Sequence, residues 1–193
     1  MSKPADTPRF IYRDFVQIPV DRVGVLIGEG GKVKREVEKQ LGVELNVDSE
    51  SGLVEVKLKE GEEPSKLFKA KDVVTAIANG FSPERALKLV DEDVSLALVD
   101  LRDYVGDSEK SLVRIKGRII GEEGKARRFI EEATGAFVSV SRDKVAIIGD
   151  YDALEIAKKA VEMLASGKQH STVYRYLMSK RRELKRRKLS LLY

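Results

Sequence analysis

The sequence predicts an α+β fold in which one module of the order β-α-α-β-β-α occurs twice and is followed by a basic C-terminal helix. A 22-residue segment recurs 93 residues further along the chain, which indicates a duplicated module. Strand-like alternation and helix-like spacing of apolar residues flank both copies in the same order. Lys and Arg gather after residue 167, which indicates the final helix.

The composition excludes several classes of protein. The chain has 193 residues and 42% hydrophobic content, which suits one large domain or two small ones. It has no Cys and one His, so disulfides, thiolate metal sites and His clusters are excluded. No apolar run reaches the roughly 18 residues of a membrane span, and the start of the chain is not signal-like. We expect a cytoplasmic protein that uses no cofactor and contacts no membrane.

The charge is distributed unevenly. The net charge is +4, but residues 168–193 hold nine Lys and Arg against Glu183, a net charge of +8 that leaves −4 on residues 1–167. A basic tail on a mildly acidic body indicates a polyanionic partner, although a solvated tail explains it too. Leu177 and Leu184 lie one heptad apart in the tail, so we expect a helix over 171–188 that packs lightly on the body while its Lys and Arg side chains meet the polyanionic partner. His170 is interpreted as a surface residue.

The two copies of the repeat are residues 27–48 and 120–141, which align without gaps and share nine identities in 22 positions. The shared residues are Ile27/Ile120, Gly28/Gly121, Glu29/Glu122, Gly31/Gly124, Lys32/Lys125, Arg35/Arg128, Glu38/Glu131, Gly42/Gly135 and Val47/Val140.

In the first copy the apolar pattern predicts strands over 15–20, 43–47 and 53–58. It predicts helices over 23–27 and 32–41 and a closing helix around 67–77. Gly42 is expected to end the second helix in the left-handed conformation.

In the second copy the corresponding strands are expected over 96–101, 136–140 and 145–148, and the helices over 112–120, 125–134 and 151–164. Gly135 is the matching helix stop, and Asp150 is the expected cap of the last helix. Alternation places Phe137 on the outward face of the sheet.

Between the copies, Ser82 and Pro83 predict the start of a short helix that ends near residue 90. We expect domain boundaries at 10–80 and 92–167, with a linker helix over 81–91 and a basic tail over 168–193. The acidic run over 91–93 is interpreted as a turn rather than a metal site.

Each copy carries a Gly-x-x-Gly sequence between two predicted helices. Glycines allow a tight turn that lets a phosphate backbone approach the peptide chain, and the N-terminus of the following helix favours an anion. Basic residues follow at once in both copies. In the first copy we expect nucleic-acid contacts from Ile27, Gly28, Glu29, Gly30, Gly31, Lys32, Lys34 and Arg35. In the second copy we expect them from Arg114, Lys116, Arg118, Ile120, Gly121, Glu122, Glu123, Gly124, Lys125, Arg127 and Arg128.

These sequences, Ile-Gly-Glu-Gly-Gly-Lys at 27–32 and Ile-Gly-Glu-Glu-Gly-Lys at 120–125, resemble the Ile-Gly-x-x-Gly signature of type I KH domains. The fold expected is therefore two tandem type I KH domains with a basic C-terminal helix. From about Phe10 to Lys188 the chain resembles the archaeal relatives of the KH protein called partner of Nob one, or Dim-two. That resemblance implies binding of single-stranded RNA, namely small-subunit (16S) ribosomal RNA near its 3′ end during ribosome biogenesis. It also implies work alongside a PIN-domain endonuclease and a ribosomal RNA dimethylase.

The loops depart from the usual KH pattern, because their variable positions lack a basic residue. They hold Glu29 and Gly30 in the first copy and Glu122 and Glu123 in the second, and a carboxylate beside a phosphate is repulsive. The second loop is also approached by Arg114, Lys116 and Arg118, so both loops stay candidates. The alternative is that each Gly-x-x-Gly sequence only forms the turn between two helices and binds no ligand.

No nucleophile with a base, Walker motif or dinucleotide motif is found in the sequence, so we expect a non-enzymatic adaptor. Two alternatives remain open. One is a protein scaffold whose KH folds have lost RNA binding, and the other is a general KH protein associated with messenger RNA or the exosome.

Overall fold

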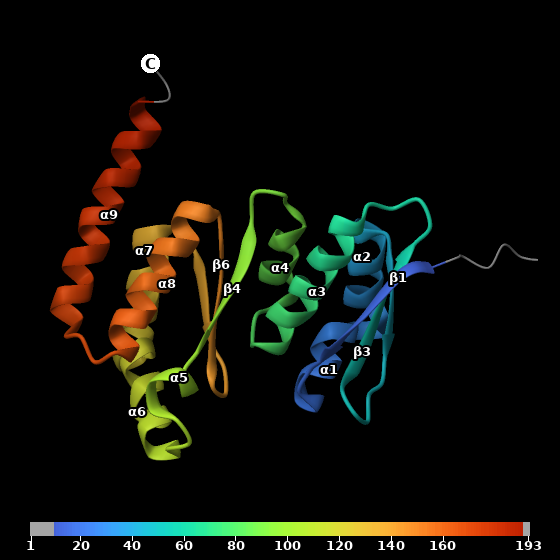
Figure 1. Ribbon diagram of the computed structural model, residues 1–193, viewed down its shortest axis with the longest axis horizontal. Helices are drawn as coiled ribbons and strands as arrows, with labels where there is room; N and C mark the ends of the chain where they lie inside the picture. Colours follow the sequence, from blue (N-terminus) through green and yellow to red (C-terminus); the bar gives the residue numbers. More distant parts are fainter. Residues whose placement is uncertain (1–9, 191–193) are drawn as a thin grey trace, which may run out of the picture. The chain divides into compact units, whose positions relative to one another are not determined.

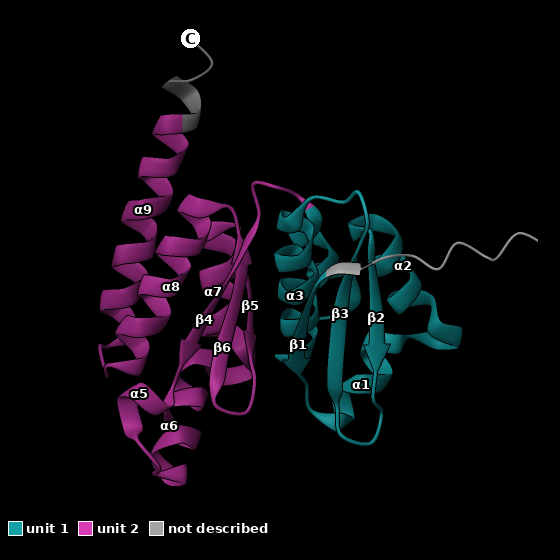
Figure 2. Ribbon diagram, turned by 45° about the vertical axis from the view of Figure 1, so that its right-hand side comes forward, with its two compact units in different colours: residues 1–90 teal, residues 91–193 magenta. Residues whose placement is uncertain are grey.

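The computed structural model describes residues 10–190, and the chain divides into two compact units, Met1–Val90 and Asp91–Tyr193 (Figure 2). Each unit contains an antiparallel three-stranded sheet with the first strand at one edge and the third strand in the middle. The sheet orders are β1-β3-β2 and β4-β6-β5, as the labels of Figure 2 show, and Figure 1 colours the elements along the chain. Both units therefore show the predicted β-α-α-β-β-α order, with additional short helices in both and a long final helix in the second.

The first unit follows the predicted order and ends in two short helical turns. Its elements are β1 (Phe10–Gln17), α1 (Val20–Ile27), η1 (Glu29–Gly31), α2 (Lys32–Leu41), β2 (Val43–Val47), β3 (Leu53–Lys59), α3 (Pro64–Ala78), α4 (Pro83–Ala86) and η2 (Leu87–Val90). Residues Phe81, Ala86 and Leu89 are buried, and η2 packs against α3 and α2.

The second unit repeats this order and adds a short helix after its first strand and a long helix at its end. Its elements are β4 (Ser95–Asp100), α5 (Arg102–Val105), α6 (Glu109–Ile120), η3 (Glu122–Gly124), α7 (Lys125–Thr134), β5 (Phe137–Val140), β6 (Lys144–Gly149), α8 (Tyr151–Ala165) and α9 (His170–Ser190).

One face of each sheet carries the core. In the first unit Leu45 of β2 lies opposite Val56 of β3, and both are fully buried. In the second unit Val138 of β5 lies opposite Ile147 of β6 in a core shared with the helices. Phe137 pairs with Ile148 on the other face and is half-buried, so its predicted outward direction on the sheet is confirmed.

In both units, the predicted start of the helix before the corner is wrong. The strand expected over 15–20 ends at Gln17, and α1 begins at Val20, because Pro19 stands before the helix with φ −60° and ψ 138°. In the second unit α6 begins at Glu109 rather than 112, because the Ser108 side chain accepts a hydrogen bond from the backbone N–H of Ser111. Neither start carries an apolar signal that periodicity detects.

The C-terminal helix α9 is part of the second unit's core, which corrects the expectation of light packing. Val173 and Leu177 are fully buried, and the Tyr174 ring lies 4.4 Å from the Phe129 ring of α7, measured between centroids. The interpretation of His170 as a surface residue is also wrong. Its ring is half-buried, and its Nε2 lies 2.8 Å from the backbone oxygen of Arg118.

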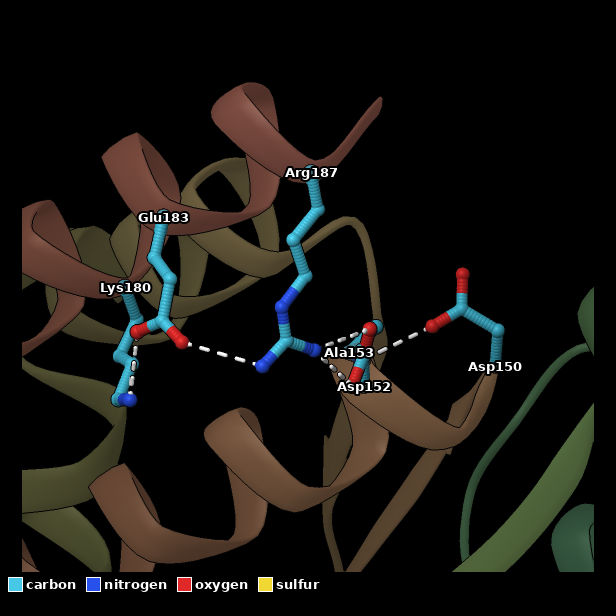
Figure 3. A network of polar contacts seen from close by, with 6 residues as sticks. All are labelled: Asp150, Asp152, Ala153, Lys180, Glu183 and Arg187. Carbon is cyan, nitrogen blue, oxygen red and sulfur yellow. Dashed lines mark hydrogen bonds and ion pairs between the residues drawn. The ribbon is translucent and has the colours of Figure 1, made fainter. Parts of the chain in front are cut away.

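Further along α9, a polar network joins the helix to the start of α8 (Figure 3). Lys180 donates to Glu183 at 2.7 Å, and this hydrogen bond lowers the pKa of the Glu183 carboxyl. Arg187 contacts Glu183 at 3.2 Å and Asp152 at 3.4 Å. Asp150 caps α8, as predicted, by accepting from the N–H of Ala153 at 2.8 Å.

Candidate nucleic-acid interface

The two Gly-x-x-Gly sequences form the same backbone corner. The first glycine has φ 71° and ψ 171° at Gly28, and φ 73° and ψ 172° at Gly121. The second has φ 79° and ψ 15° at Gly31, and φ 77° and ψ 14° at Gly124. This agreement within a few degrees shows that the sequence repeat encodes one geometry, which joins α1 to α2 and α6 to α7.

The first glycine of each corner is required by packing as well as by its backbone angles. A Cβ on Gly28 would lie 2.5 Å from Cγ2 of Val33, and one on Gly121 would lie 2.7 Å from both Cβ and N of Ala126. Both positions also have positive φ, which side chains rarely adopt. The following helix therefore lies so close to the corner that only glycine fits at the first position.

The third position of the corner differs between the copies. Gly30 has φ 56° and Glu123 has φ 51°, and Glu123 is the only non-glycine residue with positive φ in the described part of the chain. A side chain in this region costs about 1–3 kcal/mol. The second corner thus holds a strained residue that is also an exposed carboxylate.

Each corner presents the N-terminus of a helix to solvent, together with cations. The helix α2 begins after Gly31 and α7 after Gly124, and no side chain caps either of them, so amide groups of the first turn are left for an anion. Lys32 is exposed, and Lys125 is 64% exposed with only a long 3.9 Å ion pair to Glu122. A phosphate can therefore lie against the corner with a cation beside it.

The other basic residues predicted after each loop lie on the same helices in different settings. Lys34 pairs with Glu38 at 3.6 Å, whereas Arg35 and Arg128 are exposed. The Nε of Arg127, the counterpart of Lys34, is buried without a hydrogen-bond partner among the described residues.

The structure brings together two of the three cations expected on the approach to the second corner, because Arg114 and Arg118 line the same hollow and Lys116 does not. Arg114 is exposed and lines a hollow of about 450 Å³ together with Gly121, Lys125 and other residues. Lys116 instead donates to the backbone oxygen of Arg142 at 3.0 Å. Arg118 donates to the backbone oxygens of Leu164 and Lys168 at 3.4 and 2.6 Å.

Sequence reasoning missed that the first unit contains the same arginine clamp. Arg22 of α1 donates through Nε to the Ile77 oxygen at 2.8 Å and through Nη2 to the Phe81 oxygen at 2.6 Å. Ile77 is the second-last residue of α3, as Leu164 is of α8, so the two arginines hold corresponding carbonyls. Arg22 lies six residues before its corner and Arg118 three, so an alignment of the copies gives no signal of this equivalence.

The shared glutamates of the repeat have a structural role. Glu38 accepts a hydrogen bond from the backbone N–H of Leu45 at 2.9 Å, and Glu131 accepts one from Val138 at 2.8 Å. Each bond ties the helix after the corner to the adjoining edge strand. Helix and strand are thereby held as two walls beside the corner.

Surfaces beside the first corner offer room for bases. Ile27 and Ile120, the last residues of α1 and α6, are half-buried, as groove-floor residues are. A hollow of about 500 Å³ lies over the strands β1, β2 and β3 next to Lys34 of α2, and it is lined by Phe15, Lys34, Asn46, Val47, Asp48, Leu53 and Glu55. Such a surface suits stacking on apolar atoms and hydrogen bonds to base edges.

Other kinds of site receive no support from the described residues. Over residues 10–190, no group of three or more His, Asp or Glu side chains gathers in a way that would hold a metal ion. In the same range, none of the helices combines the length and the apolar content that crossing a membrane requires.

Comparisons with known proteins agree with the geometry. A model described as a eukaryotic type KH-domain (KH-domain type I) matches residues 95–182, and a KH domain model matches residues 13–76. A KH domain-containing protein of Methanocaldococcus jannaschii is 46% identical over 178 residues, which cover 92% of this chain and 78% of that protein.

Two further relatives carry informative names. The pre-rRNA-processing protein pno1 of Schizosaccharomyces pombe is 29% identical over 161 residues, which cover 82% of this chain and 67% of that protein. The crystal structure of an a/eIF2alpha-aDim2p-rRNA complex from Pyrococcus horikoshii contains a chain that is 44% identical, with a TM-score of 0.83 over 89% of this chain and 95% of that chain. Two KH domains with this extent of similarity place the chain in the family of tandem KH proteins that includes archaeal Dim2p and eukaryotic pno1.

Proposed function

We propose that the chain is a single-stranded RNA-binding adaptor that acts without catalysis in the maturation of small-subunit (16S) ribosomal RNA, near its 3′ end. The observation that carries the proposal is the duplicated corner, in which the backbone geometry and the following lysine are the same in both units. The names of the relatives, which mention pre-rRNA processing and a complex with rRNA, favour ribosomal RNA over other RNA.

The corner acts on the RNA backbone rather than on the bases. A phosphate lies against the two glycines, where it receives amide N–H groups from the following helix and faces Lys32 or Lys125. The neighbouring bases then extend over Ile27 or Ile120 toward the edge strand. Sequence preference is therefore expected to arise beside the corner, while affinity arises at it.

The proposed role of the adaptor is to hold a segment of the RNA in reach of processing enzymes. A PIN-domain endonuclease and a ribosomal RNA dimethylase are the proposed partners, because both act on RNA and need a strand that is held open. The complex of Dim2p with a/eIF2alpha and rRNA supports the idea that one family member joins RNA and protein.

Charge reversal at the corners tests the proposal without harming the fold. Lys32→Glu combined with Lys125→Glu places a carboxylate in the first turn of α2 and α7, where the helix dipole favours it but a phosphate does not. We expect the affinity for a single-stranded fragment of the rRNA 3′ end to fall on the order of 100-fold, measured by fluorescence anisotropy.

The matched control reverses Lys39 and Lys110, two exposed lysines away from the corners, with the same change in net charge. Its affinity should stay within about threefold of the unaltered chain. If the unaltered chain binds no single-stranded RNA, the scaffold interpretation replaces this one. If the unaltered chain does bind RNA, sequencing of RNA crosslinked to it in cells separates ribosomal RNA from messenger RNA.

A further inference from the structure

The helix α9 presents a row of cations that the corner geometry does not use. Exposed basic side chains recur along the length of the helix, and none of them forms an ion pair among the described residues. They are Arg175, Arg181, Arg182, Lys185 and Arg186. The other side of the helix is fixed, because Val173 and Leu177 are buried and Arg187 contacts Asp152. The cations are therefore held on a rigid element of 21 residues, about 30 Å long.

This basic face, defined as the five residues above, begins beside the second corner. His170 at the start of α9 contacts the backbone oxygen of Arg118, three residues before Gly121. The hollow of about 450 Å³ described above has walls from both elements, since it is lined by Gly121, Lys125, His170 and Tyr174 among others. Arg175 follows five residues after His170, which is about 1.4 helical turns. A strand that leaves the corner can thus pass directly onto the helix.

Charge explains why the second unit needs such a helix. Its corner carries Glu122 and Glu123, whereas the first corner carries Glu29 alone, so phosphate binding is opposed more strongly in the second unit. The unit with the more acidic corner is also the unit that carries α9. The basic face adds positive charge near a corner that carries two carboxylates.

The chemistry of the face favours a phosphate backbone over a protein surface. Four of its five cations are Arg, whose planar guanidinium matches the geometry of phosphate oxygens. Protein interfaces rely on apolar or aromatic anchors, and Met178 is the only large apolar side chain in the described part of α9 that is strongly exposed.

We propose that the basic face of α9 is a second RNA-binding surface, which holds the backbone of the strand beyond the nucleotides clamped at Gly121–Gly124. The proposal rests on the RNA-binding function proposed above. Contacts of this kind are independent of sequence, so the face extends the length of RNA held and adds affinity without adding base preference.

The test compares short and long RNA. A variant with Arg175→Gln, Arg182→Gln and Arg186→Gln neutralises three exposed side chains, and circular dichroism verifies that the helix remains. We expect its affinity for a 12-nucleotide single strand to fall about tenfold and the slope of log K against log salt to fall by about 2 in magnitude. A four-nucleotide strand, which fills only a corner, should bind as it does to the unaltered chain.

A control variant with Lys39→Gln, Lys110→Gln and Lys159→Gln changes the net charge by the same amount at exposed positions elsewhere. An unchanged affinity and salt slope for the 12-nucleotide strand would overturn the inference and leave the face to an acidic protein. Equal losses for both RNA lengths, or equal losses in the control, would overturn it as well. If the unaltered chain binds neither RNA, the proposed function itself fails. This outcome can be told apart from failure of the inference, because it is measured on the unaltered chain before any variant is compared.

Discussion

Within each corner, the four positions carry different constraints. Gly28 and Gly121 have positive φ and no space for a Cβ, whereas Gly30 has positive φ in open space. Glu123 occupies the position equivalent to Gly30, so the backbone there accepts a side chain at the expense of strain. The first glycine maintains the fold, and the third position adjusts the charge that a phosphate meets.

Two alanine substitutions in the first corner separate space from backbone angle. Gly28→Ala should lower the free energy of unfolding by about 2–4 kcal/mol, because its Cβ would overlap Val33 and its φ is unfavourable. Gly30→Ala should lower it by only about 1 kcal/mol, since it has the φ penalty alone. Urea unfolding measures both, and equal losses would show that the close approach of α2 has no energetic weight.

Substitution of Glu123 tests strain and charge together. Glu123→Asn removes a carboxylate from the second corner and places there a residue that tolerates left-handed angles. We expect RNA affinity to rise about threefold and stability by about 0.5–1 kcal/mol, measured by anisotropy and urea unfolding. Glu132→Gln on the exposed side of α7 is the charge control. A fall in affinity with Asn would indicate that Glu123 contacts the RNA favourably.

The corner residues that we propose to bind phosphate could be identified from the sequence, but several residues that hold the corner in place could not. Gly42 and Gly135 were predicted to be left-handed helix stops, and both have this conformation. The clamps by Arg22 and Arg118 join residues more than 45 positions apart. Such hydrogen bonds leave no periodic trace, so Arg118 was predicted from its charge alone to contact RNA.

At the scale of helices and strands, prediction succeeded where both ends carry a glycine. The bounds of α2 and α7 agree with the sequence-based ranges, because Gly31 and Gly42 or Gly124 and Gly135 flank an amphipathic stretch. The first helices were predicted too short, because the apolar Val20 at the start of α1 was assigned to the preceding strand, and because the first turn of α6 is polar and depends on a serine cap. Prediction also underestimated how closely α9 packs on the second unit, because its many basic residues make the row of buried apolar residues hard to recognise in the sequence.

The buried stripe of α9 makes a prediction about stability. Leu177→Ala should lower the free energy of unfolding of the second unit by about 3 kcal/mol, because the side chain is fully buried. Leu184→Ala, one heptad further, should cost about 1 kcal/mol, since that side chain is only half-buried. Urea unfolding of the full chain measures both. A negligible effect of Leu177→Ala would mean that α9 does not pack in solution as it does in the structure.

For the whole molecule, the proposed function implies that two corners, each binding weakly by itself, act on one strand. Linked sites gain from effective concentration, so the chain can bind tightly although neither corner has a basic residue at its variable positions. The uneven charge adds to this, because the acidic body repels RNA that does not lie on a corner or on α9.

The dependence of binding on salt measures this cooperation. With roughly four to five phosphates neutralised at the corners, log K against log salt should have a slope near −3, to which contacts with α9 add. Lys32→Glu alone or Lys125→Glu alone should reduce the corner contribution to about −1.5 and weaken binding at least tenfold, since one corner then holds the strand. A titration series from low to high salt checks both. Identical slopes in single variants and the unaltered chain would exclude binding by both corners.

The arginine clamps have a consequence for exchanging parts between the two units. Arg22 and Arg118 perform one task from positions a helical turn apart, so a residue-by-residue transfer guided by the repeat would carry over the corner and lose the clamp. In a hybrid unit, the arginine clamp to the closing helix α3 or α8 should form only if the whole of α1 or α6 is exchanged together with the corner. The two copies have kept the same contact although the arginine that makes it stands at a different position. For this contact, the carbonyl groups that accept the hydrogen bonds therefore correspond between the units, whereas the arginines do not align in the sequence.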